Sequence, residues 1–208
     1  MIDGVIKTNA RTIKWQGFRG GEAGAVVYYE SDPNSELPLR NIPVKEGVIP
    51  VMDPNYETKT YGLYDCANTK LRNSFVKKKR GYLFFMTRYN GTNPDFEGKV
   101  LLTGYYRVKS SADVQKLHLR HLESSSCIND RTCQALLGTE AVFLSLEDSY
   151  KLTAVALKSI GYEKKITRMS KILLDDEMVQ KLLKKFKGKD NIIEQYIEET
   201  HDLMPTVE

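Results

Sequence analysis

The chain has 208 residues, of which 41% are hydrophobic and 28% are charged, and its formal net charge is +4. This composition is ordinary for a globular protein, and the length fits one large domain or a domain with an appendage. No apolar run approaches the ~18–20 residues that span a bilayer, and the N-terminus lacks the basic and apolar parts of a signal peptide. We therefore expect a cytoplasmic protein that does not bind membranes. The three cysteines are too few, and odd in number, for a disulfide framework.

The first 150 residues or so have the patterns of a β-rich body. Runs of β-branched and aromatic residues predict strands at residues 25–29, 81–89, 99–108 and 141–146. Turn-forming residues at 90–94 predict a hairpin between the second and third of these strands. Helical patterns are found at 67–76 and 112–123. The five prolines between residues 31 and 60 exclude a long helix there, so we expect a long loop region.

The last part of the chain has helical periodicity and segregated charge. Acidic residues at 175–177 begin a helix whose apolar stripe ends at Phe186, and Gly188 terminates it. A second helix follows, acidic where the first is basic, and reaches about residue 203. The two helices predict a hairpin, and with it a division into a β domain at 1–160 and a helical extension at 161–208. If the hairpin serves assembly, truncation after about residue 170 is expected to leave binding nearly intact.

A group of potential metal ligands precedes the last predicted strand. His118 and His121 are followed by Cys127 and Cys133, and imidazole and thiolate are the ligands that zinc prefers. The two cysteines are six residues apart, however, instead of the two to four of a zinc knuckle, and the histidines lie on a predicted helix. We therefore predict no metal and no cofactor, and interpret these residues as core or surface, with a zinc site and a redox pair of cysteines as the alternatives.

Two further motifs bear on catalysis. Asp53 with Glu57 and Lys59 has the residue types of a metal-dependent nuclease site, but these residues share one proline-rich loop instead of neighbouring strands. The glycine-rich loop at 17–24 lacks the Lys-Ser/Thr ending of a triphosphate-binding loop and is typical of a turn, with anion binding as the alternative. No motif requires catalysis, so we predict no catalytic residue and favour a binding protein over an enzyme.

Aromatic residues are frequent on the predicted strands and occur there in neighbouring pairs, Tyr28–Tyr29, Phe84–Phe85 and Tyr105–Tyr106. Because successive side chains of a strand point to opposite faces, one member of each pair is expected to point inwards and the other outwards. Outward rings near positive charge would provide stacking faces for bases. The alternative is that the aromatic residues only build the core.

Four segments resemble a known family: 60–65 (Thr-Tyr-Gly-Leu-Tyr-Asp), 70–72 (Lys-Leu-Arg), 79–85 (Lys-Arg-Gly-Tyr-Leu-Phe-Phe) and 102–108 (Leu-Thr-Gly-Tyr-Tyr-Arg-Val). Together, over roughly residues 38–150, they are similar to the nucleotide-modification-associated domains, relatives of the EVE, ASCH and YTH modules. The resemblance implies an α+β fold, with a PUA-like β-barrel body, peripheral helices and here the C-terminal helical hairpin. Tyr82 departs from the family pattern, which has an acidic residue after the turn glycine.

The resemblance also implies a function, the recognition of a modified base or nucleotide in DNA or RNA through an aromatic pocket. It places Tyr61, Tyr64 and Asp65 at the pocket rim and Arg88 near a phosphate. On chemical grounds alone we add Trp15 and Phe18 to the nucleotide-binding residues. The basic run is expected to contact phosphates; its members are Lys77, Lys78, Lys79 and Arg80. Two alternatives remain open: an assembly protein that forms a homo-oligomer through residues 175–203, and a nucleic-acid-modifying enzyme.

Overall fold

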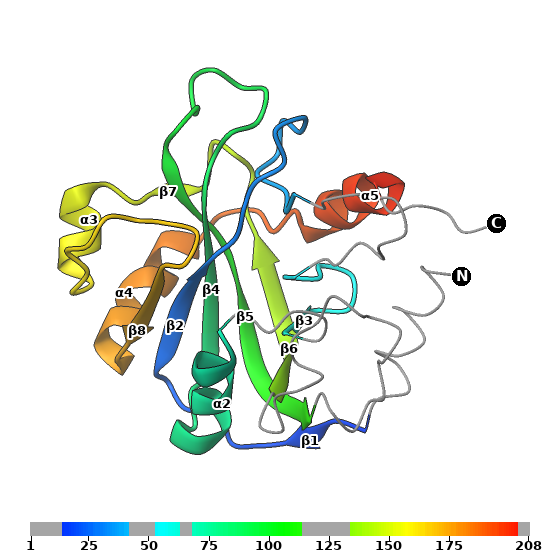
Figure 1. Cartoon of the computed structure of the whole chain (residues 1–208), viewed down its shortest axis with the longest axis vertical. Helices are drawn as coiled ribbons and strands as arrows, with labels where there is room; N and C mark the ends of the chain where they lie inside the picture. Colours follow the sequence, from blue (N-terminus) through cyan, green and yellow to red (C-terminus); the bar gives the residue numbers. More distant parts are fainter. Residues whose placement is uncertain (1–13, 42–52, 63–67, 114–133, 204–208) are drawn as a thin grey trace.

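The computed structural model describes residues 14–41, 53–62, 68–113 and 134–203, and it arranges them as one sheet with helices on both faces (Figure 1). The strands are β1 (Gln16–Gly17), β2 (Gly24–Tyr28), β3 (Thr60–Tyr61), β4 (Tyr82–Arg88), β5 (Val100–Asp113), β6 (Gln134–Phe143), β7 (Tyr150–Lys151) and β8 (Lys171–Leu174). The helices are α2 (Thr69–Lys78), α3 (Ala154–Ser159), α4 (Asp176–Phe186) and α5 (Ile193–Leu203). The expected mixed α and β class is confirmed, as is the antiparallel β4–β5 pair. The helix expected at 112–123 falls largely outside the described residues, and its first two residues belong to β5.

In the part of the chain that the structure describes, the sheet is open and does not close into a barrel. Its strand order is β3-β6-β5-β4-β2-β8, and β1 and β7 pair with the two ends of the long central strand β5. Neither edge strand, β3 or β8, pairs with the other in the described part of the chain. The closed β-barrel expected from the family resemblance is therefore not formed by the described residues.

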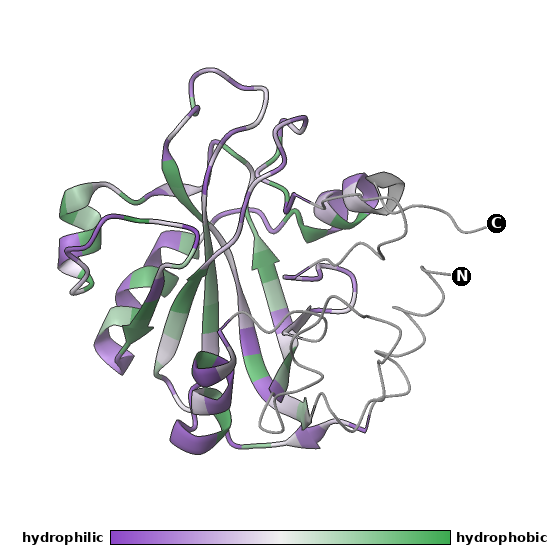
Figure 2. Ribbon diagram, in the orientation of Figure 1, coloured by the Kyte–Doolittle hydropathy of each residue, from purple (hydrophilic) through white to green (hydrophobic). Residues whose placement is uncertain are grey.

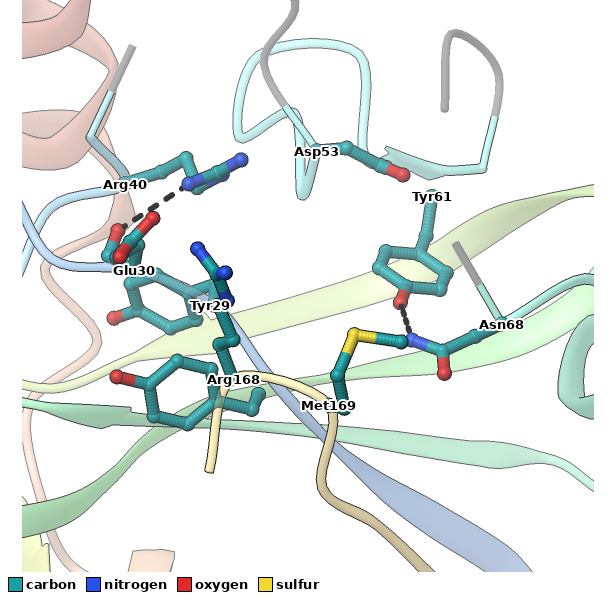
Figure 3. A pocket seen from close by; sticks show the side chains of 9 residues that line it. Tyr29, Glu30, Arg40, Asp53, Tyr61, Asn68, Arg168 and Met169 are labelled. Atoms are coloured by element: carbon teal, nitrogen blue, oxygen red, sulfur yellow. Dashed lines mark hydrogen bonds between the residues drawn. The ribbon is translucent and has the colours of Figure 1, made fainter. Parts of the chain in front are cut away.

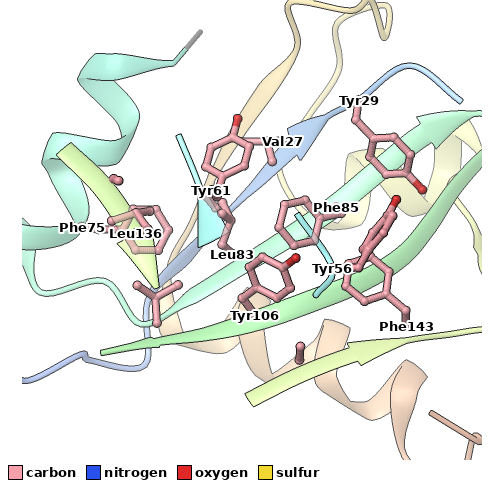
Figure 4. Packing of buried hydrophobic residues seen from close by; sticks show 14 of the residues in the cluster. Val27, Tyr29, Tyr56, Tyr61, Phe75, Leu83, Phe85, Tyr106, Leu136 and Phe143 are labelled. Atoms are coloured by element: carbon pink, nitrogen blue, oxygen red, sulfur yellow. The ribbon is translucent and has the colours of Figure 1, made fainter. Parts of the chain in front are cut away.

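Alternate strand residues enter two separate hydrophobic clusters, one on each face of the sheet. Phe85 and Tyr106 lie in the first cluster, which α2 and α5 cover (Figure 4), whereas Phe84 and Tyr105 lie in the second, under α3 and α4. Figure 2 shows the corresponding pattern, with apolar residues along the strands and hydrophilic residues on the visible side of α2. Because helices cover both faces, the expectation that one member of each aromatic pair points outwards is wrong for both of these pairs. Only Tyr28, at the end of β2, stays partly exposed.

The two C-terminal helices form as predicted but do not pack as a hairpin. The apolar stripe of α4 places Val179, Leu182 and Phe186 in the second cluster, whereas α5 places Ile193 and Tyr196 in the first. The two stripes therefore face opposite sides of one sheet. The segment also contributes β8, which pairs antiparallel with β2 and which the sequence patterns did not indicate.

The connection between β2 and β4 determines where the candidate site lies. These neighbouring strands are parallel, so the chain must return from the end of β2 to the start of β4. On the way it forms β3 at the far edge of the sheet and then α2, which packs Leu71 and Phe75 into the first cluster. Loop residues around 53–62 and the beginning of α2 are thus brought to the carboxyl end of β2.

Candidate functional site

A pocket of about 160 Å³ lies at the carboxyl end of β2, where segments far apart in sequence meet (Figure 3). The end of β2 and the loop after it form one wall, the start of α2 and the end of β3 form another, and the loop before β8 closes the third side. The lining residues are Tyr28, Tyr29, Glu30, Arg40, Asp53, Tyr61, Asn68, Arg168 and Met169.

Tyr29 forms a rigid wall of this pocket. Its backbone N–H donates to the carbonyl of Met86 at 2.9 Å, which continues the pairing of β2 with β4. Its hydroxyl donates to the carbonyl of Pro38 and also lies 3.0 Å from the Thr103 hydroxyl. Burial raises the pKa of Tyr29 far above its ordinary range, so the hydroxyl stays protonated. The Tyr29 ring therefore forms part of the pocket wall, while its hydroxyl is already hydrogen-bonded within the protein.

Tyr61 and Asn68 form a hydrogen-bonded pair on the opposite wall. The Tyr61 ring lies 5.9 Å from the ring of Phe85, and its hydroxyl accepts a hydrogen bond from Asn68 Nδ2 at 3.0 Å. Asn68 is the residue before α2 and has φ of 64°, a left-handed conformation that asparagine tolerates better than most residues. Its side chain does not cap the helix. Asn68 lines the pocket, and its second amide N–H and its amide oxygen have no partner among the described residues.

Two arginines bring positive charge to the pocket. Arg40 Nη1 donates to the carbonyl of Glu30 at 3.5 Å, while its Nε is buried and has no acceptor among the described residues. Arg168 is exposed, and within the described part of the chain its guanidinium has no hydrogen bond or ion pair. A buried donor without an acceptor costs about 1–3 kcal/mol, so Arg40 would gain from an anionic or carbonyl-bearing ligand.

The pocket also contains two carboxylates, which limit its positive charge. Asp53 is buried and accepts a hydrogen bond from the backbone N–H of Gly62 at 2.7 Å, so it joins the chain before β3 to the residue directly after β3. Glu30 is exposed at the rim. Among the described residues no group of three His, Cys, Asp or Glu side chains is placed to hold a metal ion. His118, His121 and the three cysteines lie outside the described residues.

The structure brings one of the expected nucleotide-binding residues, Tyr61, to the pocket. Trp15 and Phe18 flank β1 and pack on the edge of the first cluster. Because β1 pairs with Ser110 and Ser111 of β5, beyond the part that faces β4, they lie at the opposite end of the sheet. Arg88 ends β4 and donates to the carbonyl of Gly98 at 2.7 Å. It is not among the lining residues of the pocket, although it lies close to the lining residue Tyr28, whose pKa is raised by burial and lowered in part by Arg88. Tyr64 and Asp65 lie outside the described residues.

The basic run lies at the far end of α2. The helix has ten residues from Thr69 to Lys78, which corresponds to about 15 Å between the pocket and the run. Lys77, Lys78 and Lys79 are exposed. Arg80 instead uses its Nη1 to bond the carbonyl of Gly24 at 2.8 Å and that of Leu174 at 3.0 Å, and burial lowers its pKa. Arg80 thus has a structural role where β2 pairs with β8.

Sequence reasoning missed most of the polar groups in the pocket. Arg40 comes from the proline-rich loop, Asn68 from the turn before α2, and Arg168 from the loop before β8. No short motif contains any two of them, so only the folded chain brings them together. One signal was available in the sequence, the proline-rich segment between residues 31 and 60. It predicts a long loop region, and functional residues are often found on such loops.

Comparison with protein-family models, with curated proteins and with solved structures finds no match to this chain. The resemblance to the nucleotide-modification-associated domains therefore stays a prediction. Within the described residues no helix is sufficiently long and apolar to cross a membrane.

Proposed function

We propose that the protein binds a modified base or nucleotide of DNA or RNA, with the base entering the pocket at the end of β2. The observation that carries the proposal is the combination, in one pocket, of the Tyr61–Asn68 pair with the guanidinium groups of Arg40 and Arg168. Aromatic walls, an amide with free hydrogen-bonding groups and cations are the means by which proteins hold an unstacked base and its phosphate.

The size of the pocket supports a small ligand portion. Its volume of about 160 Å³ is below the ~300–1,000 Å³ of typical small-molecule sites. A large cofactor does not fit such a space, whereas a single base or a phosphate is of the right order. The rest of a polynucleotide would then lie outside the pocket, on the surface.

The assembly alternative has less support. It relied on the apolar stripes of the two C-terminal helices, and those stripes are buried against the two faces of the chain's own sheet. The enzyme alternative has no observation in its favour among the described residues of the pocket, where the Asp53 carboxylate accepts a hydrogen bond from the backbone N–H of Gly62.

The test is a binding titration of Arg168→Gln with labelled single-stranded oligonucleotides, modified and unmodified. A hydrogen bond to a charged group contributes about 1.5–3 kcal/mol, so we expect the affinity to fall roughly 10- to 100-fold. Arg168 is exposed, and the melting temperature should be unchanged. Arg19→Gln is the matched control, since Arg19 is an exposed arginine beside β1 at the other end of the sheet. Equal effects of the two variants, or no binding by the wild type, would overturn the proposal.

A further inference from the structure

A second, wider hollow adjoins the pocket along the edge of the sheet. It has a volume of about 680 Å³ and shares Met169 with the pocket. Its walls are the loop after α3 and the edge strand β8. The lining residues are Gly161, Tyr162, Glu163, Lys164, Lys165, Thr167, Met169, Ser170, Lys171, Ile172 and Leu173. We refer to it as the β8 groove.

The β8 groove is positively charged. Three exposed lysines line it, Lys164, Lys165 and Lys171. Their side chains form no hydrogen bond or ion pair with a described residue. The one acidic residue of the lining, Glu163, lies 3.8 Å from Lys158. Arg168, at the junction with the pocket, adds a fourth cation to this side of the molecule.

The β8 groove also exposes apolar side chains, which is unusual for this protein. Met169 is 70% exposed and Leu173 is 55% exposed. They are two of the three large hydrophobic residues that are exposed among the described residues. Lys171 and Leu173 alternate with the buried Ile172 and Leu174, so they point to the same face about 6.6 Å apart. A surface that places a cation beside an apolar side chain can contact both the phosphates and the bases of a single-stranded nucleic acid.

The strand register places this face on the side of the pocket. Leu173 pairs with Ala25, and Lys171 pairs with Val27. Residues directly opposite in an antiparallel pair share a face, and Ala25 and Val27 are in the first cluster together with Tyr29. Lys171 and Leu173 therefore lie on the same face of the sheet as Tyr29 of the pocket, whereas Ile172 faces the second cluster.

The loop that separates the two hollows is already ordered by its own hydrogen bonds. The backbone N–H of Thr167 donates to Ser170 Oγ at 2.8 Å, and the Ser170 N–H donates to the Thr167 carbonyl at 2.8 Å. The Tyr162 hydroxyl also bonds Ser170 Oγ, at 3.0 Å. Ile166 is buried in the second cluster and anchors the loop. Binding here would therefore have a small ordering cost.

We infer that the β8 groove holds the single-stranded DNA or RNA that flanks the base in the pocket, with Lys164, Lys165 and Lys171 contacting its phosphates. This inference rests on the proposed function and changes the predicted phosphate contacts, because it assigns them to this groove instead of to the run at 77–80. Charge complementarity and the shared Met169 favour nucleic acid over other occupants.

The experiment compares two triple variants with the same loss of charge. One replaces Lys164, Lys165 and Lys171 by glutamine, and its control replaces Lys77, Lys78 and Lys79. Each is titrated with a ten-nucleotide single strand at several salt concentrations and with a nucleoside monophosphate. The groove variant should lose oligonucleotide affinity. Its plot of log association constant against log salt concentration should also become shallower by about two units, since each of the three phosphate contacts on a single strand contributes ~0.7 to the slope. Its affinity for the monophosphate should stay within twofold of wild type, and the control should match wild type with both ligands.

The inference is overturned if the two triple variants behave alike, or if the control loses more affinity than the groove variant. It is also overturned if an oligoglutamate peptide binds as well as the oligonucleotide and loses affinity in the same variant. In each of these cases the proposed function still stands, provided that Arg168→Gln weakens binding of the monophosphate. If Arg168→Gln has no effect on either ligand, the proposed function itself has failed.

Discussion

Tyr61 shows how a residue can be expected at a site for one reason and act there for another. The family resemblance places Tyr61 at the rim of a pocket for a base, yet the residue is only 4% exposed and its ring packs against Phe85. What Tyr61 presents to the pocket is its hydroxyl, through the hydrogen bond from Asn68. Its expected role is therefore to orient the Asn68 amide, and stacking would fall to the more exposed Tyr28.

This role predicts the behaviour of Tyr61→Phe. The ring stays, so the free energy of unfolding should fall by about 0.5–1.5 kcal/mol for each hydrogen bond of the hydroxyl that is lost, the one from Asn68 included. Binding should weaken as well, because the Asn68 amide is no longer held in place. The measurements are a denaturant titration and a binding titration on the same sample.

Tyr105→Phe is the matched control for that variant. The Tyr105 hydroxyl is likewise hydrogen-bonded to one side chain, donating to Glu140 at 2.8 Å, but Tyr105 lies in the second cluster on the other face of the sheet. We expect a similar small loss of stability with unchanged affinity. If Tyr61→Phe binds as tightly as Tyr105→Phe, Tyr61 has no positioning role.

The residues of the site could be predicted only where a local pattern marked them. The run at 77–80 is conspicuous in the sequence because its cations are adjacent, but adjacency says nothing about what they contact. Arg80 in fact bonds the carbonyls of Gly24 and Leu174. Arg40 and Arg168 are isolated in sequence and meet only through the return of the chain from β2 to β4 and the pairing of β8 with β2.

At the scale of elements, periodicity predicted the long strands and the helices but not their partners. The elements that lie close to their expected positions are those with enough residues to show a periodic pattern of apolar residues, namely β2, β4, β5, α4 and α5. β8 has four residues, begins with a lysine, and was missed. The apolar stripes of α4 and α5 are equally compatible with each other and with a sheet, so the hairpin was a plausible but incorrect choice of packing.

The observed packing predicts that the C-terminal segment cannot be removed. Truncation after residue 170 takes away β8 and with it the edge partner of β2. It also removes Phe186 from beside Phe84 and Tyr196 from the first cluster, where loss of a single large aromatic side chain typically costs about 3–5 kcal/mol. Since whole domains are stable by only ~5–15 kcal/mol, we expect no cooperative thermal transition.

Thermal melting followed by circular dichroism tests whether the chain truncated after residue 170 still unfolds cooperatively. The control is a chain that ends at residue 203, because it keeps all of these contacts. A truncated protein that still melts cooperatively and binds nucleotide normally would restore the original division at residue 160.

For the molecule as a whole, the high aromatic content is explained mainly by the core. Tyr29, Tyr56, Tyr106 and Tyr196 are all buried in the first cluster, and burial is the main cause that raises the pKa of each. The sheet separates two hydrophobic clusters, and the two described hollows lie at its β2–β8 edge. The pocket and the β8 groove both lie there, with the cations of both on one side of the molecule.

The central claim is that a nucleotide binds at this edge, and photo-crosslinking tests it without any mutation. Single-stranded DNA carrying iododeoxyuridine, or RNA carrying thiouridine, is irradiated with the wild-type protein, and the crosslinked peptides are identified by mass spectrometry. We predict crosslinks in the peptides that contain Tyr28 and Tyr29, Tyr61, and Met169, which line the pocket. Crosslinks confined to the run at 77–80, or to Trp15 and Phe18 beside β1, would contradict the claim and place the binding surface at the opposite end of the sheet.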